Sequence, residues 1–240
     1  HVRQAAHFVS QRISPGATGG QSEHEKSFPH NTGVPLSRPV PYRRPGCDCD
    51  ESAQTLKSLT FVIPAHNEAL NIEGCLLSIQ KAAPGAQIIV VADACSDDTA
   101  ERARKLGAEV VEVQHRHIAA TRNAGGRAAE GEVLIFLDGD TRVSGEVVRG
   151  ILAEVGRGTA GGGALFRFDR PVPFYALVAE KLAQWFCRLS QMSGGCILYC
   201  TREIFGQLGG FSTELYAGEE LDFAHRLKKL GRFRVVPHAV

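Results

Sequence analysis

Four short runs rich in valine and isoleucine, separated by amphipathic stretches, constrain the fold more than any other feature of this sequence. The runs are LTFVI from Leu59, QIIVVA from Gln87, AEVVEV from Ala108 and VLIFL from Val133. Short apolar runs that alternate with helical patterns indicate parallel strands buried on both faces. The sequence therefore predicts an α/β fold with a Rossmann-like, mostly parallel sheet flanked by helices.

The intervals between these runs carry the apolar spacing and the end signals that are typical of helices. We expect one helix over residues 68–81, with Asn67 as its N-cap. A second helix is expected over residues 98–106, where Asp98 and Glu101 have the spacing of a capping box. Helices in these intervals would complete the crossover connections that parallel strands need.

The pattern is looser after Asp140, but it continues the same architecture. A helix is expected over residues 146–155. The glycine-rich stretch GGGALF from Gly161 is predicted to be a strand with a close backbone approach, not a phosphate-binding loop. A long amphipathic helix over residues 173–189 and a final helix over residues 219–230 are expected to follow.

Composition divides the chain into a leader and a single domain. Residues 1–55 are rich in Pro, Ser, Gly, His and Arg, so apolar burial could not offset the entropy cost of ordering them. We expect this leader to be disordered, and its basic bias is compatible with an organelle-targeting segment. Residues 56–240 are expected to form one domain, with a nucleotide-binding half over 56–141 and a more variable half over 142–240.

The charge balance, the apolar runs and the cysteines limit the partners and the location that we expect for this chain. The chain has 27 basic and 26 acidic side chains, a net charge of +1, so no overall field attracts nucleic acid. It has no run of the roughly 18 apolar residues that a membrane-spanning helix needs, so any membrane contact would be peripheral. Seven cysteines without the spacing of a disulfide framework favour a reducing compartment, and we expect a cytoplasmic protein.

Two aspartates end the run VLIFL, one residue apart. Asp138 and Asp140 follow a predicted buried strand, and Gly139 between them leaves the turn open. Ligands of parallel sheets bind at the carboxyl ends of the strands, where two carboxylates on one side can share a divalent cation. Oxygen ligands of this kind select Mg²⁺ or Mn²⁺. The alternative is a polar turn, because Asp-Gly is a common turn sequence.

Two further groups of acidic residues are candidates for a site. Asp93 ends the run QIIVVA, and Glu219, Glu220 and Asp222 lie at the start of the final predicted helix. Asp93, Ser96, Asp97 and Asp98 could instead cap a helix, and acids in a first helical turn favour the helix dipole. Both interpretations stay open at both places.

Four ordered motifs resemble those of the family 2 glycosyltransferases, which have the GT-A fold. The motifs are FVIPAHNEALNIEGCLLSI from Phe61, VVADACSDDTAE from Val90, ATRNAGGRAAEGEVLIFLDGDT from Ala120 and LGGFSTELYAGEELDFAHRLKKLG from Leu208. The resemblance covers roughly residues 58–236, and four ordered motifs are much more specific than any one of them. It implies a metal-dependent, inverting transfer of a sugar from a nucleoside-diphosphate sugar to an acceptor hydroxyl.

The resemblance also implies roles for single residues. Asp138 and Asp140 would bind Mn²⁺ or Mg²⁺ on the diphosphate of the donor, with Asp138 also near the ribose. Further nucleotide-binding positions would be Pro64, Ala65 and Glu68 at the border of the nucleotide, Asp93 on the base, and Arg122 with Asn123 along the same pocket. The half over residues 142–240 would bind the sugar and the acceptor.

The family takes its general base from an aspartate in the last acidic motif, where this chain has Glu220. One extra methylene moves the carboxylate by roughly 1.5 Å, and catalytic geometry tolerates little misplacement. We expect Glu220 to be the base, with Asp222 or Glu219 as substitutes. This departure, together with a chain that ends at Val240 where many relatives continue, motivates an alternative: a non-catalytic nucleotide-sugar or glycan binding module.

His238 and the segment around Trp185 are two further candidates for contacts with a metal ion or an acceptor. His238, after the last predicted strand, could add a metal ligand, although an ordinary surface histidine is the favoured alternative. The segment around Trp185 could lie on a membrane surface where a lipid-linked acceptor would wait, but core packing is favoured. A sugar-phosphate nucleotidyltransferase or a dinucleotide oxidoreductase is excluded, because PAHNEA from Pro64 stands where their glycine-rich loops would be.

Overall fold

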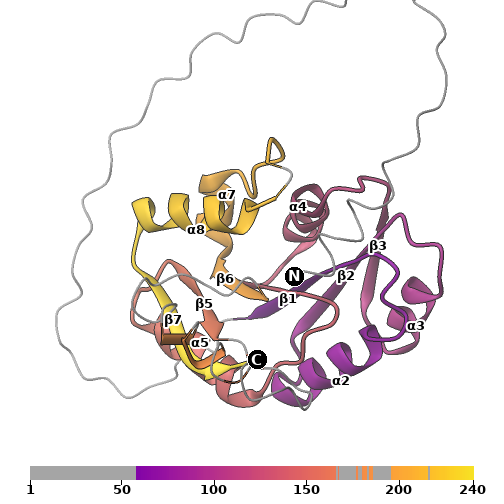
Figure 1. Ribbon diagram of the computed structural model, residues 1–240, viewed down its shortest axis with the longest axis horizontal. Helices are drawn as coiled ribbons and strands as arrows, with labels where there is room; N and C mark the ends of the chain where they lie inside the picture. The colour runs from indigo at the N-terminus through magenta and orange to yellow at the C-terminus, as the bar shows by residue number, and fades with distance from the viewer. Residues whose placement is uncertain are drawn as a thin grey trace, which may run out of the picture. The chain divides into compact units, whose positions relative to one another are not determined.

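A seven-stranded sheet organises the protein, with the strand order β3-β2-β1-β4-β6-β5-β7 (Figure 1). The computed structural model describes residues 58–165, 167, 177, 180–182, 184–185, 196–215 and 217–240. The strands are β1 (Leu59–Ala65), β2 (Gln87–Asp93), β3 (Glu109–Val113), β4 (Val133–Leu137), β5 (Gly161–Leu165), β6 (Ile197–Thr201) and β7 (Phe233–Ala239). Strand β6 runs antiparallel to both of its neighbours, and the other paired strands are parallel. The predicted mostly parallel sheet is confirmed.

Helices cover both faces of this sheet (Figure 1). They are α2 (Ile72–Ala82), α3 (Thr99–Lys105), α4 (Ile118–Ala128), α5 (Gly145–Gly156), α7 (Arg202–Leu208) and α8 (Glu219–Leu230). Phe61 of β1 packs in one core with Leu76 of α2 and Ile151 of α5. Val62, the next residue, packs in the other core with Phe205 of α7 and Phe223 of α8. The alternation along one strand fills both cores, as expected for a sheet buried on both faces.

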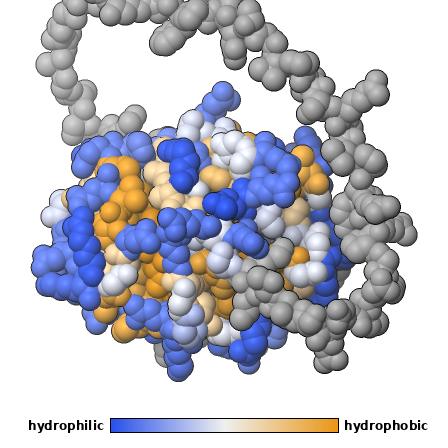
Figure 2. Space-filling view, turned by 180° about the vertical axis from the view of Figure 1, so that it is seen from behind, coloured by the Kyte–Doolittle hydropathy of each residue, from blue (hydrophilic) through white to orange (hydrophobic). Residues whose placement is uncertain are grey.

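Some predicted segments lie outside the described residues: the leader over 1–55 and most of the helix over 173–189. In the described part of that helix Glu180 and Gln184 are buried, whereas Trp185 is 62% exposed. Trp185 itself therefore does not pack in the core, and most of the segment for which core packing was expected lies outside the described residues. On the face of the molecule opposite to that of Figure 1, hydrophobic residues are exposed between hydrophilic ones (Figure 2). No helix within the described ranges is long and apolar enough to cross a membrane.

The ends of two helices differ from the sequence prediction. Helix α2 begins at Ile72, later than expected, and Asn67 does not cap it. Asn67 has a left-handed backbone with a φ of 55°, and its side-chain oxygen accepts a hydrogen bond from Ser96 N–H at 2.7 Å instead. Asp98 is the N-cap residue of α3, but its backbone is not extended and its side chain pairs with Arg102. The predicted capping box is therefore wrong, since an extended N-cap is what directs the side chain to the helix.

Helix α7 was not predicted, although its sequence carries both end signals. The hydroxyl of Thr201 accepts a hydrogen bond from Ile204 N–H, which caps the first turn. Gly209 ends the helix with a φ of 70°, a conformation that glycine adopts without strain. The short length of the helix hides its apolar period, so these two capping residues are the signal that could have found it.

The glycines of β5 allow a close approach of the neighbouring strands, as predicted. A Cβ atom on Gly162 would lie 1.7 Å from the carbonyl oxygen of Arg234 in β7. A Cβ atom on Gly161 would lie 2.4 Å from the carbonyl oxygen of Tyr199 in β6. The prediction of a strand with a close backbone approach is confirmed.

The loops after β1 and β2 are joined by Asp97 and Thr99. The Asp97 carboxylate accepts hydrogen bonds from the N–H groups of Ala69 and Thr99, each at 3.1 Å. The Thr99 hydroxyl accepts one from Glu68 N–H at 2.8 Å. Burial acts to raise the pKa of Asp97, but the hydrogen bonds from Thr99 and Ala69 hold it below its usual value. Both loops at the carboxyl edge of the sheet are thus held in one arrangement.

Two glycines let α4 lie directly on its neighbours. A Cβ atom on Gly125 would lie 2.3 Å from Val62 Cγ1 of β1, and one on Gly126 would lie 2.4 Å from the Phe205 ring of α7. Both contacts are shorter than real Cβ atoms show. The glycines of the ATRNAGG motif therefore set how near α4, with its Arg122, comes to the sheet.

We predict that Gly125→Ala destabilises the protein by about 1–3 kcal/mol, because the new methyl group meets a branched core side chain that cannot move away. Denaturant unfolding followed by circular dichroism measures the effect. The control is Gly206→Ala in α7, where no atom lies within 4 Å of the new Cβ. This control should be neutral or stabilising by about 0.5–1 kcal/mol, since alanine is the better helix former. Equal effects at the two positions would contradict the close packing of α4.

A second prediction concerns the pH dependence of stability. The folded pKa of Asp97 lies below the unfolded value of 3.8, so its stabilisation is present above pH 3.8 and is lost as the pH falls through the folded pKa. At pH 7 Asp97→Asn should cost about 1 kcal/mol of unfolding free energy, and the difference from wild type should shrink in acid. Unfolding curves at pH 7 and pH 3 measure this. Asp98→Asn is the control, because its exposed ion pair with Arg102 contributes little; a constant Asp97→Asn difference at both pH values would refute the prediction.

Candidate active site

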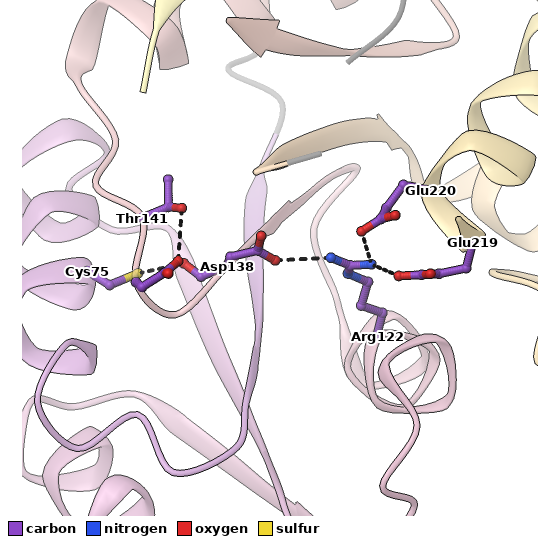
Figure 3. A network of polar contacts seen from close by, with 7 residues as sticks. Cys75, Arg122, Asp138, Thr141, Glu219 and Glu220 are labelled. Carbon is purple, nitrogen blue, oxygen red and sulfur yellow. Dashed lines mark hydrogen bonds and ion pairs between the residues drawn. The ribbon is translucent and has the colours of Figure 1, made fainter. Parts of the chain in front are cut away.

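The side chain of Arg122 joins three carboxylates from two other elements (Figure 3). Its Nη2 donates to Asp138 Oδ1 at 3.0 Å, directly after the end of β4. Its Nη1 donates to Glu219 Oε1 at 2.6 Å and to Glu220 Oε1 at 2.9 Å, both in the first turn of α8. Helices α4 and α8 and strand β4 therefore meet at one guanidinium group.

This network is buried, and the charges within it control one another. The side chains of Arg122 and Asp138 are each 2% exposed, that of Glu219 is 4% exposed and that of Glu220 is 12% exposed. Burial acts to lower the pKa of Arg122, but Asp138, Glu220 and Glu219 outweigh it and raise the pKa. Burial, followed by the neighbouring Glu220, raises the pKa of Glu219 despite the attraction of Arg122. When all four groups are ionised, three negative charges face one positive charge.

The Asp138-Gly139-Asp140 stretch forms a turn with its two carboxylates in different surroundings. The carbonyl oxygen of Asp138 accepts a hydrogen bond from Thr141 N–H at 3.0 Å, which closes the turn. Asp138 is buried, whereas Asp140 is exposed. Both charges still act on one neighbour, because burial and then Asp138 and Asp140 raise the pKa of Cys196 to about 12. The stretch is therefore a polar turn, and the charges of both of its carboxylates act on Cys196.

The donor atoms at this turn fit a hard divalent cation. Asp138 and Asp140 offer oxygen atoms, which Mg²⁺ and Mn²⁺ prefer. The excess of negative charge in the network around Asp138 would be reduced by a cation. Mg²⁺ is commonly bound by one or two carboxylates together with substrate phosphates, so two aspartates are a sufficient protein contribution.

His238 does not join the two aspartates. It lies within β7 and not after the last strand, and its Nδ1 is 3.7 Å from Glu146 Oε2 of α5. Its ring also lies 3.4 Å from the Cβ position of Gly150, in the same helix. Across the described ranges no three His, Cys, Asp or Glu side chains are grouped so that they could hold a metal ion. The extra residues of β7 carry His238 alongside α5, which the sequence prediction of a shorter strand missed.

Two of the residues predicted to border the nucleotide, Pro64 and Glu68, lie beside the Asp138-Gly139-Asp140 turn. Pro64 and Ala65 are the last two residues of β1, and both are buried. The carbonyl oxygen of Pro64 lies 3.6 Å from the Cβ position of Gly139, and Glu68 Cγ lies 3.4 Å from it. The structure therefore brings the end of β1 and Glu68 against the Asp138-Gly139-Asp140 turn.

Asp93 binds the backbone at the start of α4. Its Oδ1 accepts from Arg116 N–H at 2.9 Å, and its Oδ2 accepts from His117 N–H at 3.2 Å and from the Thr121 hydroxyl at 2.7 Å. The sequence alternative placed the acids from Asp93 to Asp98 at the start of α3. Asp97 does bind the N–H of Thr99 there, whereas Asp93 binds the residues just before α4. Because a carboxylate offers about four acceptor sites, the three bonds of Asp93 leave room for one more donor.

Asn123 has both of its side-chain polar atoms bound to one backbone position. Its Nδ2 donates to the carbonyl oxygen of Phe211 at 2.8 Å, and its Oδ1 accepts from Phe211 N–H at 2.8 Å. Gly210 is needed beside it, because a Cβ atom there would lie 2.4 Å from Asn123 Oδ1. The structure thus gives Asn123 a partner within the protein, between α4 and the segment after α7.

The three acids of α8 have different environments. Glu219 and Glu220 face Arg122, as described above. Asp222 instead pairs with Arg226 at 2.7 Å along the same helix, and Arg226 also donates to the carbonyl oxygens of Leu208 and Gly210. Asp222 is therefore part of the contact between α7 and α8, and it does not belong to the Arg122 network.

Three residues that hold the site together were missed in the sequence. The thiol of Cys75 in α2 donates to the carbonyl oxygen of Asp138 at 3.8 Å, and the carbonyl oxygen of Cys196 accepts from Asp138 N–H at 3.3 Å. The third is Thr121, whose hydroxyl binds Asp93. Cys75 shares the buried face of α2 with ordinary core residues, so its sequence position carries no separate signal. Thr121 directly precedes Arg122 in the ATRNAGG motif, which could have pointed to it.

Sequence comparisons give a family and several relatives. The pattern of "Glycosyl transferase family 2" matches residues 60–198. The 4,4'-diaponeurosporenoate glycosyltransferase of Staphylococcus haemolyticus is 29% identical over 106 residues, which are 41% of this chain and 28% of that protein. Glycosyltransferase AglE of Haloferax volcanii is 33% identical over 95 residues, 36% of this chain and 31% of that protein. The matched segments span less than a third of these curated relatives.

Solved structures with the same fold include three transferases or synthases. S. aureus TarS 1–349 has a TM-score of 0.58 at 19% identity, over 76% of this chain and 59% of that one. Mannosyltransferase PcManGT from Pyrobaculum calidifontis, in complex with GDP-Man and Mn²⁺, has a TM-score of 0.59 at 22% identity, over 78% and 56%. Glucosyl-3-phosphoglycerate synthase from Mycobacterium tuberculosis, with Mn²⁺ and UDP, has a TM-score of 0.54 at 21% identity, over 75% and 70%.

These neighbours match the seven-stranded α/β fold of the GT-A transferases. The family pattern covers residues 60–198, which is more than half of the 240-residue chain. It includes β1 to β4 and therefore Arg122, Asp138 and Asp140. The chain belongs to glycosyl transferase family 2.

Proposed function

We propose that this protein is a metal-dependent, inverting glycosyltransferase that moves a sugar from a nucleoside-diphosphate sugar to an acceptor hydroxyl. The observation that carries the proposal is the meeting of Arg122, Asp138 and Glu220 at the edge of the sheet where β4 ends. Parallel sheets bind ligands at this edge. One carboxylate pair for a cation and a separate carboxylate for a proton are what glycosyl transfer from a diphosphate requires.

In this proposal Asp138 and Asp140 hold Mn²⁺ or Mg²⁺ at the diphosphate of the donor. The bound cation would supply positive charge against the charge that grows on the leaving diphosphate. The Mn²⁺ complexes of PcManGT and of glucosyl-3-phosphoglycerate synthase support this choice of ion. The base and ribose would lie along the ends of β1 and β2, beside Pro64, Glu68 and Asp93, whose loops are fixed by hydrogen bonds.

Glu220 is the residue we propose as the general base. Its carboxylate would take the proton of the acceptor hydroxyl while the hydroxyl oxygen attacks the sugar carbon and the diphosphate leaves with the electron pair of the broken bond. Two features favour Glu220 over its neighbours. Glu220 is more exposed than Glu219. Arg122 also bridges Glu220 to Asp138, whereas Asp222 is bound to Arg226.

Binding of nucleoside diphosphates tests the donor site. We expect calorimetric titration with UDP, GDP and dTDP to show one diphosphate that binds with Mn²⁺ and loses at least about ten-fold in affinity with a chelator. Asp140→Asn should lose most of the Mn²⁺ effect, since it removes one charged oxygen ligand from an exposed position. Asp98→Asn, a similar change on an exposed aspartate of α3, should behave like wild type. Equal affinities with and without the ion in wild type would argue against the metal site.

Release of nucleoside diphosphate from the donor tests the base. Glu220→Gln should lower the turnover number by about 10²–10⁴-fold while donor affinity stays within a few-fold, because the amide cannot take a proton. Asp222→Asn is the matched control and should leave the turnover number within a few-fold of wild type. If Asp222→Asn were the more damaging change, the base would have to be reassigned. Donor binding without any turnover in wild type would favour a non-catalytic nucleotide-sugar binding module.

A further inference from the structure

We propose that Arg122 is the internal counter-ion of this site: it positions Glu220 against Asp138, and it competes with a divalent cation for the Asp138 carboxylate. The proposal rests on the metal-dependent function described above. It concerns a positioning residue, since Arg122 would act on Glu220 and Asp138 and would not take part in bond breaking.

The guanidinium of Arg122 has the geometry of a bridge between Asp138 and the two glutamates. The two Nη atoms of Arg122 face in different directions, with Asp138 on one side and the two glutamates on the other (Figure 3). Asp138 is 16 residues away in the sequence, and Glu219 and Glu220 are 97 and 98 residues away. A planar guanidinium with fixed donor directions can hold both sides at set distances, which a lysine ammonium cannot do equally well. Helix α8 is therefore tied to the end of β4 through one side chain.

Helix α4, which carries Arg122, is held in place by its own contacts. Gly125 and Gly126 bring the helix onto Val62 and Phe205, and Asp93 binds the backbone at its start. The guanidinium of Arg122 also lies over the Phe211 ring, with 5.5 Å between Cζ and the ring centroid. These contacts fix the helix, so Arg122 is presented to the carboxylates from a rigid support. Its position is then set by packing and not by the carboxylates alone.

The positive charge of Arg122 opposes the binding of a cation at Asp138. Asp138 Oδ1 is bound to a positive group, yet Asp138 is the buried member of the pair proposed to hold the cation. A guanidinium so close to a cation site repels the ion and occupies one ligand atom, so it lowers the affinity of the site. Glu219 has the opposite effect, because its negative charge lies on the same guanidinium at 2.6 Å. The metal affinity should therefore follow the net charge of the network.

The test measures Mn²⁺ binding to the full chain by electron paramagnetic resonance of the free ion, with no nucleotide present. Arg122→Gln should bind Mn²⁺ at least about ten-fold more tightly than wild type, because the competing charge is gone. Arg122→Lys keeps the charge and should stay within about three-fold of wild type. Glu219→Gln should bind at least about three-fold more weakly. The double variant Arg122→Gln with Glu219→Gln restores the net charge and should return to within about three-fold of wild type.

Turnover gives the second readout. Arg122→Gln and Arg122→Lys should both lose turnover by at least about ten-fold, since neither holds Glu220 and Asp138 from two sides. Tighter Mn²⁺ binding together with slower turnover is a combination that mere loss of folded protein would not give. Arg226→Gln is the matched control, because it also removes an arginine bound to a carboxylate of α8. It should lower the melting temperature but leave Mn²⁺ affinity unchanged.

The outcomes separate this proposal from the proposed function. If wild type binds no Mn²⁺ either alone or together with a nucleoside diphosphate, the metal-dependent function fails and this proposal fails with it. If wild type binds Mn²⁺ only together with the diphosphate, the variants are compared with the diphosphate present. If wild type binds Mn²⁺ but Arg122→Gln binds it equally or more weakly, the function stands and the counter-ion role is refuted. If Arg122→Gln does not fold, the Mn²⁺ affinity of Glu219→Gln is compared with that of Asp222→Asn, which removes an equal charge outside the network. Weaker binding in Glu219→Gln alone supports the proposal, and equal binding in both variants overturns it.

Discussion

The buried ion pairs of Arg122 are the interaction on which the candidate site depends. A guanidinium that is 2% exposed would be costly alone, and Asp138 and Glu219 beside it are nearly as buried. The buried guanidinium is tolerated because carboxylates from two other elements compensate its charge, so the three elements must meet in one geometry. Ion pairs thus join the end of strand β4 and the first turn of helix α8 to the middle of helix α4, while apolar packing holds these elements along their lengths.

The sheet explains why these groups can meet. β4 lies beside β1 in the middle of the strand order, and the ends of β1, β2 and β4 reach the same edge because these strands are parallel. The antiparallel strand β6 follows β4 on the other side, and its preceding residue, Cys196, binds the backbone of Asp138. Topology therefore brings residues of both halves of the chain to one place without any long-range sequence signal.

The sequence was sufficient to predict these strands and the edge of the sheet at which the candidate site lies. Runs of valine and isoleucine identify β1, β2 and β4 because burial on both faces leaves no room for polar residues. Partners of single polar side chains were not predictable. Asn67 binds Ser96 and Asn123 binds Phe211, 88 residues away, because tertiary packing decides which backbone groups lie within reach. Capping rules consider only the local helix, so they assigned Asn67 to α2 and could not foresee the backbone conformation that turns it away.

Glu220 shows how a departure from a family pattern can be absorbed by its surroundings. A glutamate has one more rotatable bond than the aspartate of the resembling motif, and an unrestrained carboxylate would explore more positions. Here its Oε1 is bound by Arg122 at 2.9 Å, which is itself bound to Asp138 and supported by α4. The Glu220 side chain is 12% exposed. Because Arg122 fixes the longer side chain, the extra rotatable bond adds little freedom, so the substitution does not by itself argue against catalysis.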